Sequence, residues 1–182
     1  MKSLKFAAET PETFPLAADG ITELHASRLL LLLKHCGTKG KIDGLTKLAK
    51  LDFFVRYPEF FDRIAEYLGK DIQSTTRTIE SAMVRHHYGP WDKRYYHVLP
   101  FLKSRGLIKV QKEGSAYRFS LTDLGIELAN KLAKTTEFSA QVDQMKKVKA
   151  LLGSKTGNRI KELIYEAFDE EVSKKALGEL IS

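Results

Sequence analysis

Cysteine and long apolar segments are nearly absent from this sequence. Its 182 residues include a single cysteine, Cys36, so no intramolecular disulfide can hold the fold together. The longest purely apolar run is Leu29–Leu33, far below the ~18 residues that a membrane-spanning helix needs. The first thirty residues contain four acidic residues and no apolar segment of signal-peptide length. We therefore expect a cytoplasmic protein with no export signal and no membrane partner.

Sequence patterns typical of enzymes and metal proteins are also lacking. Residues 37–41 contain two glycines and two lysines, but they have neither the spacing of a phosphate-binding loop nor a preceding strand. His86 and His87 are adjacent, yet no carboxylate pair lies near them at metal-ligand spacing. No nucleophile-elbow motif surrounds a serine or cysteine. We therefore expect no catalytic residues, no bound metal and no cofactor.

The chain is long enough for one globular domain, and its ends differ from its middle. Hydrophobic residues make up 43% of the sequence, which suffices for a substantial core. Residues 1–20 contain Pro11 and Pro15 and show no sustained hydrophobic period. We expect an N-terminal arm over 1–20, a main domain over 21–134 and a helical extension over 135–182.

The first part of the main domain predicts helices. Apolar residues are so dense over 21–35 that the predicted helix should be apolar on most sides and lie centrally in the core. A loop over 37–44 should follow. A second helix over 45–55 should be interrupted by Pro58 and continue beyond it. The polar stretch 71–89 has no clear pattern, although residues 82–84 could form a short strand.

The next segment predicts a helix with defined ends. Gly89 and Pro90 should open it, because proline is favoured in the first helical turn. Apolar residues then recur at three- and four-residue steps. Pro100 should bend this helix, and Gly106 should end it as a C-terminal stop.

A short hairpin and another helix follow this predicted helix. Residues 107–110 and 117–121 flank a short segment with a polar tip, which predicts two antiparallel strands. Thr122 should then cap a helix that runs to about residue 132. A helix, a hairpin "wing" and a closing helix are the order of a winged helix-turn-helix domain. The predicted fold class is mainly α with a small β-hairpin: a winged helix-turn-helix core plus a C-terminal helical extension. The alternative is an unrelated helical domain with a small hairpin.

Positive charge is concentrated in this winged-helix region. The net charge is +7, and residues 71–134 contribute 11 basic and 6 acidic residues, an excess of +5. In a DNA-binding winged helix the recognition helix enters the major groove and the wing contacts the backbone, so double-stranded DNA is a candidate partner. The alternative is a solvated basic face or a protein-binding face. The candidate DNA-binding residues are Arg85, Lys93, Arg94, His97, Lys112 and Arg118.

Beyond residue 134 the pattern predicts amphipathic helices. Apolar residues over 138–152 and 160–168 recur at helical spacing, and a weaker pattern covers 172–181. These helices either pack on the main domain or form a surface for a second chain. Trp91 has the same two interpretations, a core anchor or part of a partner surface. The candidate partner-binding residues are Trp91, Phe138, Val142, Met145, Ile164 and Phe168.

Two segments extend the interpretation to a family. Residues 41–58 contain LTKLAKLDFFVRYP, and residues 88–92 read YGPWD. Together with the predicted wing, they resemble the middle component of bacterial ABC-three-component defence systems, a group that includes the Lamassu-type anti-phage systems. The resemblance covers about residues 24–134. It implies a non-catalytic accessory subunit that links an SMC-like ATPase, which engages DNA, to an effector such as a nuclease. The alternative is a winged-helix transcriptional regulator that binds DNA alone.

Overall fold

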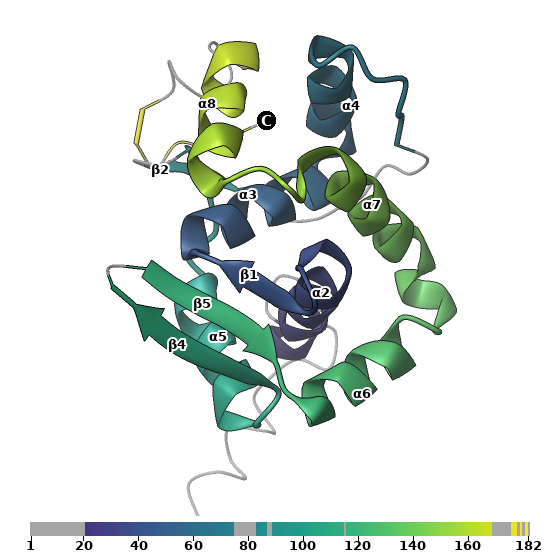
Figure 1. Ribbon diagram of the computed structural model, residues 1–182, viewed down its shortest axis with the longest axis vertical. Helices are drawn as coiled ribbons and strands as arrows, with labels where there is room; N and C mark the ends of the chain where they lie inside the picture. Colours follow the sequence, from purple (N-terminus) through teal and green to yellow (C-terminus); the bar gives the residue numbers. More distant parts are fainter. Residues whose placement is uncertain are drawn as a thin grey trace, which may run out of the picture.

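The computed structural model describes residues 21–74, 83–86, 89–114 and 116–168, together with 176, 177, 179 and 181. Within these residues the chain forms seven helices and two small antiparallel sheets (Figure 1). The mainly helical fold with a small sheet is therefore confirmed. The elements are α2 (Thr22–Cys36), β1 (Lys41–Asp43), α3 (Leu45–Arg56), α4 (Pro58–Tyr67), β2 (Val84–His86), β3 (Gly89–Trp91), α5 (Tyr95–Ser104), β4 (Ile108–Glu113), β5 (Ala116–Leu121), α6 (Asp123–Leu132), α7 (Thr136–Leu152) and α8 (Gly157–Ala167).

Helix α2 lies at the centre of the core, as predicted. Successive residues of a helix point about 100° apart, so five consecutive leucines place apolar groups on all sides. All of Leu29–Leu33 are buried. Figure 1 shows the three-stranded sheet on one side of α2 and helices α6 and α7 on the other. The leucine run therefore makes α2 the element around which the others pack.

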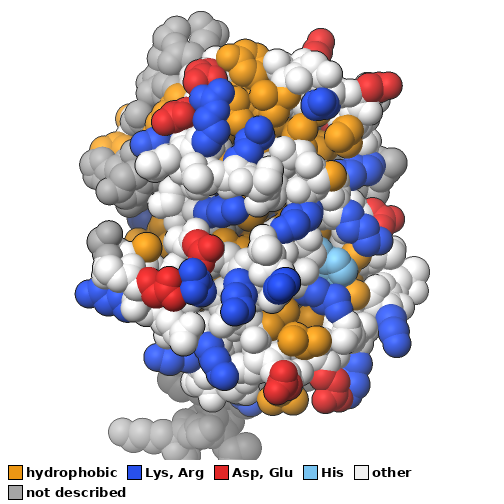
Figure 2. All heavy atoms as spheres, viewed as in Figure 1, with side chains coloured by type: hydrophobic (Ala, Val, Ile, Leu, Met, Phe, Trp, Pro, Cys, Tyr) orange, Lys and Arg blue, Asp and Glu red, His pale blue; other side chains and the backbone are white. Residues whose placement is uncertain are grey.

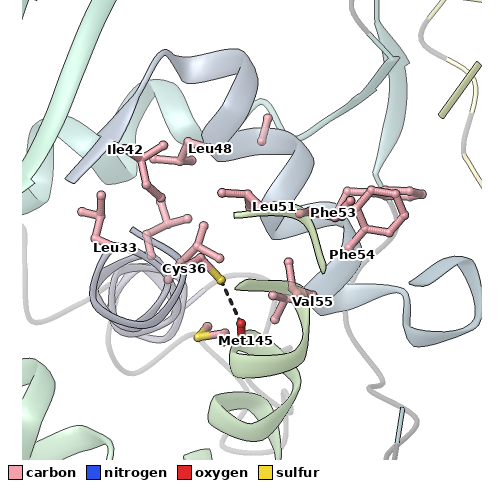
Figure 3. Packing of buried hydrophobic residues seen from close by; sticks show 14 of the residues in the cluster. Leu33, Cys36, Ile42, Leu48, Leu51, Phe53, Phe54, Val55 and Met145 are labelled. Atoms are coloured by element: carbon pink, nitrogen blue, oxygen red, sulfur yellow. Dashed lines mark hydrogen bonds between the residues drawn. The ribbon is translucent and has the colours of Figure 1, made fainter. Parts of the chain in front are cut away.

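The end of α2 joins the sheet to the C-terminal helices. Figure 3 shows Leu33 and Cys36 of α2 beside Ile42 of β1 and Leu48 of α3. The Cys36 thiol donates a hydrogen bond to the Met145 carbonyl of α7 at 3.3 Å, and burial raises its pKa. A protonated, buried thiol of this kind contributes to packing and is poorly reactive.

The larger sheet has three strands, one more than predicted. The strand order is β1-β5-β4, and all neighbours are antiparallel. The prediction of a loop over 37–44 was therefore wrong for Lys41–Asp43. Strand β1 has only three residues, of which Ile42 alone is buried, so its sequence is too short to show the polar–apolar alternation of a strand. The strand is recognised only by its pairing with Arg118, Phe119 and Ser120 of β5.

The prediction that Gly89 and Pro90 open a helix was also wrong. Gly89–Trp91 is strand β3, which pairs with β2, and α5 begins only at Tyr95. Asp92 forms the turn between them, because its carboxylate accepts a hydrogen bond from the Arg94 backbone N–H at 2.9 Å. The short strand suspected near residues 82–84 lies at Val84–His86, and residue 82 is outside the described residues.

The helix ends predicted at Pro58, Gly106 and Thr122 are confirmed. Pro58 starts α4 directly after α3, and Gly106 follows α5 with a φ of 68°, a conformation that favours glycine. Thr122 caps α6 by accepting the Gly125 N–H at 3.0 Å. A side chain at Gly125 would overlap the Leu107 carbonyl oxygen, which explains why this cap lacks the usual glutamate.

The C-terminal helices pack within the chain. Helix α7 contacts α2 and α3, and α8 contacts α3 and α4. Two lysines strengthen these contacts by binding helix ends: Lys149 donates to the carbonyls of Cys36 and Gly37, and Lys47 donates to the carbonyl of Gly153. Cations are favoured at helix C-termini. The weak helix predicted over 172–181 falls mostly outside the described residues. Every helix in the described ranges is too short or too polar to cross a bilayer.

A lysine is buried between α3 and β3. Lys50 is 0% exposed, and its ammonium group donates a hydrogen bond to the Pro90 carbonyl at 2.9 Å. Burial, with a smaller contribution from the charge of Lys161, lowers the pKa of Lys50 to about 7. The unfolded chain keeps this proton up to a pKa of about 10.4, so above pH 7 unfolding takes up a proton.

We expect Lys50→Met to change the pH dependence of stability. Because the depressed pKa of Lys50 makes the wild type more stable as pH rises above 7, the stability of the variant relative to wild type should fall by up to about 1.4 kcal/mol per pH unit. Urea unfolding between about pH 6 and pH 9 measures this slope. The control Lys131→Met removes an exposed lysine, and its free energy of unfolding should differ from that of the wild type by the same amount at every pH. Parallel curves for Lys50→Met and wild type would contradict the assignment.

Candidate nucleic-acid interface

Helix α5 and the β4–β5 hairpin carry most of the candidate DNA-binding residues. Tyr95, Val98, Leu99 and Leu102 form the buried side of α5. The opposite side exposes residues 96, 97, 100 and 103 to solvent. The position of α5 therefore decides which of its polar side chains face outward.

A buried ion-pair network holds α5 in place. Asp52 of α3 is fully buried and accepts a hydrogen bond from Arg28 Nε of α2 at 2.9 Å. The same carboxylate accepts the Tyr95 hydroxyl of α5 at 2.7 Å. Since a buried charge without partners costs several kcal/mol, these bonds fix the three helices relative to one another.

Asp92 forms the second half of this network. Its carboxylate accepts hydrogen bonds from Arg56 of α3 at 2.7 Å and from Arg94 at 2.8 Å. Burial alone would raise the pKa of Asp92, but the hydrogen bonds from Arg94 and the charges of Arg56 and Arg94 outweigh it and hold the pKa well below its usual range. His25 of α2 adds a further link, because its ring nitrogens lie 2.9 Å from Arg28 and 3.1 Å from Arg94.

The predicted DNA-binding residues differ in their exposure to solvent. Lys93, His97 and Lys112 are exposed on or beside α5 and the hairpin. Arg94 is only 19% exposed because it binds Asp92 and His25. The side chain of Arg85, on β2, lies outside the described part of the structure. The structure thus brings three of the six candidates to the surface and uses Arg94 inside the fold.

The β4–β5 hairpin carries two of the candidate DNA-binding residues, Lys112 and Arg118, on opposite faces. Lys112 pairs with Tyr117, whereas Arg118 pairs with Gln111 and Asp43. Opposed residues of antiparallel strands share a face and neighbours alternate, so Lys112 and Arg118 point to opposite faces. Arg118 forms ion pairs with Asp43 at 2.5 Å and Glu113 at 2.6 Å, which neutralise much of its charge. Lys112 lies on the face that looks toward α5.

Between α5 and this face of the hairpin lies a groove that the sequence analysis missed. Its volume is about 390 Å³. We call it the α5–hairpin groove, and it is lined by Leu45, Tyr95, Tyr96, Leu99, Pro100, Lys103, Val110, Tyr117 and Phe119. In the hairpin Val110 pairs with Phe119 and Lys112 pairs with Tyr117, so these four side chains share one face. The sequence could have indicated this face only if the register of the hairpin had been predicted.

Basic side chains are not confined to this region. Figure 2 shows Lys and Arg spread over the face that carries the three-stranded sheet and α7, with fewer Asp and Glu among them. Some basic residues are used within the fold: Lys149 and Lys47 bind helix ends, as described above. The net charge of +7 therefore overestimates the number of cations available to a phosphate backbone.

The candidate partner-binding residues contribute to the chain's own core. Trp91, Val142, Met145, Ile164 and Phe168 are buried, and Phe138 is partly buried. The Trp91 ring packs edge-on against Tyr95, with centroids 5.6 Å apart. These side chains are therefore covered without a second chain, and a partner surface would need other residues.

Comparisons with protein families, curated proteins and solved structures find no match to this chain.

We expect Asp92→Asn to destabilise the fold by about 3 kcal/mol, because it leaves the buried Arg56 without its closest carboxylate. The folded-state pKa of Asp92 lies below its unfolded value of about 3.9, so its stabilisation is complete above that pH and is lost as pH falls. Urea unfolding at about pH 7 and pH 3 should show a large difference from wild type that shrinks in acid. Asp143→Asn, which removes an exposed carboxylate, is the control and should leave the free energy of unfolding nearly unchanged, because exposed ion pairs contribute little to stability.

Proposed function

We propose that this chain is a winged-helix, non-catalytic accessory subunit of an SMC-like ATPase defence complex, and that it contacts DNA through α5 and the β4–β5 hairpin. The observation that carries the winged-helix interpretation is the strand order β1-β5-β4 combined with the chain order α2, β1, α3, α5, β4, β5. In that arrangement the strand after the first helix pairs with the hairpin that follows the recognition helix.

One feature differs from a compact helix-turn-helix. There, a turn of about three or four residues joins the two helices, whereas here residues 57–94 separate α3 from α5 and include α4, β2 and β3. The Asp52–Tyr95 hydrogen bond keeps α3 and α5 together despite this insertion. On this proposal α5 is the recognition-type helix.

The two segments that carry the family resemblance bind each other. Lys50 and Arg56 lie in residues 41–58, and Pro90 and Asp92 lie in residues 88–92. The Lys50 ammonium donates to the Pro90 carbonyl, and Arg56 forms an ion pair with Asp92. Because the two segments contact each other in the folded chain, there is a structural reason for them to occur together. This supports using them together as a family signature.

On this proposal the partners are an SMC-like ATPase and an effector such as a nuclease, with double-stranded DNA as a further ligand. A transcriptional regulator that binds DNA alone is the second candidate. The exposed Lys93 and His97 at the start of α5 favour it, since N-terminal residues of a recognition helix contact base edges.

Co-expression with the products of the adjacent genes separates these two functions. We expect a large coiled-coil ATPase to co-purify with this chain through size-exclusion chromatography. Purification as a lone species that protects a short palindromic site in its own promoter would contradict the subunit proposal and support the regulator.

DNA contact should depend on salt through the exposed lysines. Each phosphate neutralised contributes a slope of roughly 0.9 in log K against log salt. We therefore expect the double variant Lys93→Ala, Lys112→Ala to reduce that slope by nearly two for a labelled duplex followed by fluorescence anisotropy. The control double variant Lys131→Ala, Lys146→Ala removes exposed lysines of α6 and α7 and should leave the slope unchanged. A wild-type affinity that does not vary with salt would contradict DNA contact.

A further inference from the structure

Two exposed tyrosines line the α5–hairpin groove. Tyr96 of α5 is 62% exposed, and Tyr117 of β5 is 48% exposed. Large hydrophobic side chains that are exposed in the described residues also include Leu24, Leu124 and Ile126, but these lie on α2 and α6 and do not line this groove. The groove therefore presents exposed aromatic rings, and its lining also includes the buried side chains of Tyr95, Leu99 and Phe119.

The groove is already present in the folded chain without a ligand. Leu99, Val110 and Phe119 contribute apolar lining, and the volume of about 390 Å³ falls within the range of small-ligand pockets. The Tyr96 ring lies against Trp91, with centroids 6.0 Å apart. The neighbouring Tyr95 is fixed by its hydrogen bond to Asp52. A flat ring could therefore stack here without first ordering the protein.

Positive charge surrounds the aromatic rim. Lys103 lines the groove, Lys112 is the strand partner of Tyr117, and Lys93 lies one helical turn before Tyr96. The described residues that line the groove include no aspartate or glutamate. Glu113 and Asp43 bind Arg118 on the opposite face of the hairpin. An anionic ligand would therefore meet lysines without a competing carboxylate on the lining.

We infer that the α5–hairpin groove binds single-stranded nucleic acid. Bases stack on Tyr96 and Tyr117, an unpaired base enters the apolar cavity, and the lysines contact the phosphates. Aromatic side chains beside a basic track are the general means of binding single strands. A duplex does not match this groove, because its paired bases expose only their edges. The inference rests on the proposed DNA contact and adds an unpaired strand or end to the duplex as a ligand of this region.

The test compares a labelled oligothymidine of about 15 nucleotides with a duplex of the same length, using fluorescence anisotropy on the full chain. We expect the single strand to bind more tightly. Tyr96→Ala and Tyr117→Ala should each weaken its binding between about fivefold and a hundredfold, because each removes one stacking platform. Tyr96→Phe and Tyr117→Phe keep the rings and should remain within about threefold of wild type.

Tyr67→Ala is the matched control, since Tyr67 is an exposed tyrosine of α4 outside the groove and its loss should leave binding unchanged. Lys103→Glu provides a second, charge-based variant that retains both rings and should also weaken binding of the single strand. Thermal unfolding followed by circular dichroism verifies that each variant is folded.

Three outcomes would overturn the inference, and they separate it from the proposed function. Duplex binding that depends on Lys93 and Lys112 but not on the two tyrosines would leave the proposed DNA contact intact and refute the groove. If the wild-type protein bound neither the single strand nor the duplex, DNA contact would be refuted altogether. Tyrosine-dependent binding of an acidic amphipathic peptide, with no binding of oligothymidine, would assign the groove to a protein partner.

Discussion

The ion pairs of Asp52 and Asp92 with buried arginines are the constraint on which the rest of the structure depends. Chain connectivity does not fix the position of α5, because residues 57–94 intervene between α3 and α5. Charged groups in a dry interior tolerate few alternative arrangements, since a misplaced partner leaves a charge unpaired. Arg28, Arg56 and Tyr95 therefore bring α2, α3 and α5 into one geometry. The hairpin follows α5 directly, so the groove beside it inherits this geometry.

Local signals allowed much of the fold to be predicted. The leucine run placed α2 in the core, Pro58 separated two helices, and Thr122 marked the start of α6. The buried network could not be predicted, because periodicity treats the charged residues of α3 as a solvent face. Lys50, Asp52 and Arg56 are nevertheless buried, and their partners include Arg28, Pro90 and Asp92, which are 24 to 40 positions away. Nothing within one helix specifies partners at that distance.

The candidate site was predictable only in part, for the same reason. Lys93, His97 and Lys112 are exposed as the charge analysis required. Arg94 instead binds Asp92, two positions earlier, and Arg118 binds Asp43, which lies close to it only in the folded chain. Counting charges in a segment cannot distinguish a cation that faces solvent from one that is already neutralised. The groove depended on strand register, which sets Tyr117 and Lys112 on one face, and the hairpin prediction did not specify that register.

The central position of α2 also has a consequence for synthesis. A chain emerges from the ribosome N-terminal end first, so Leu29–Leu33 leave the exit tunnel well before α6 and α7, which cover them in the folded protein. Until α7 has been translated, five leucines lack part of their covering. Nascent chains that stop short of residue 152 would therefore be clients for chaperones, and the stretch from α2 to α7 would complete its core only late in translation.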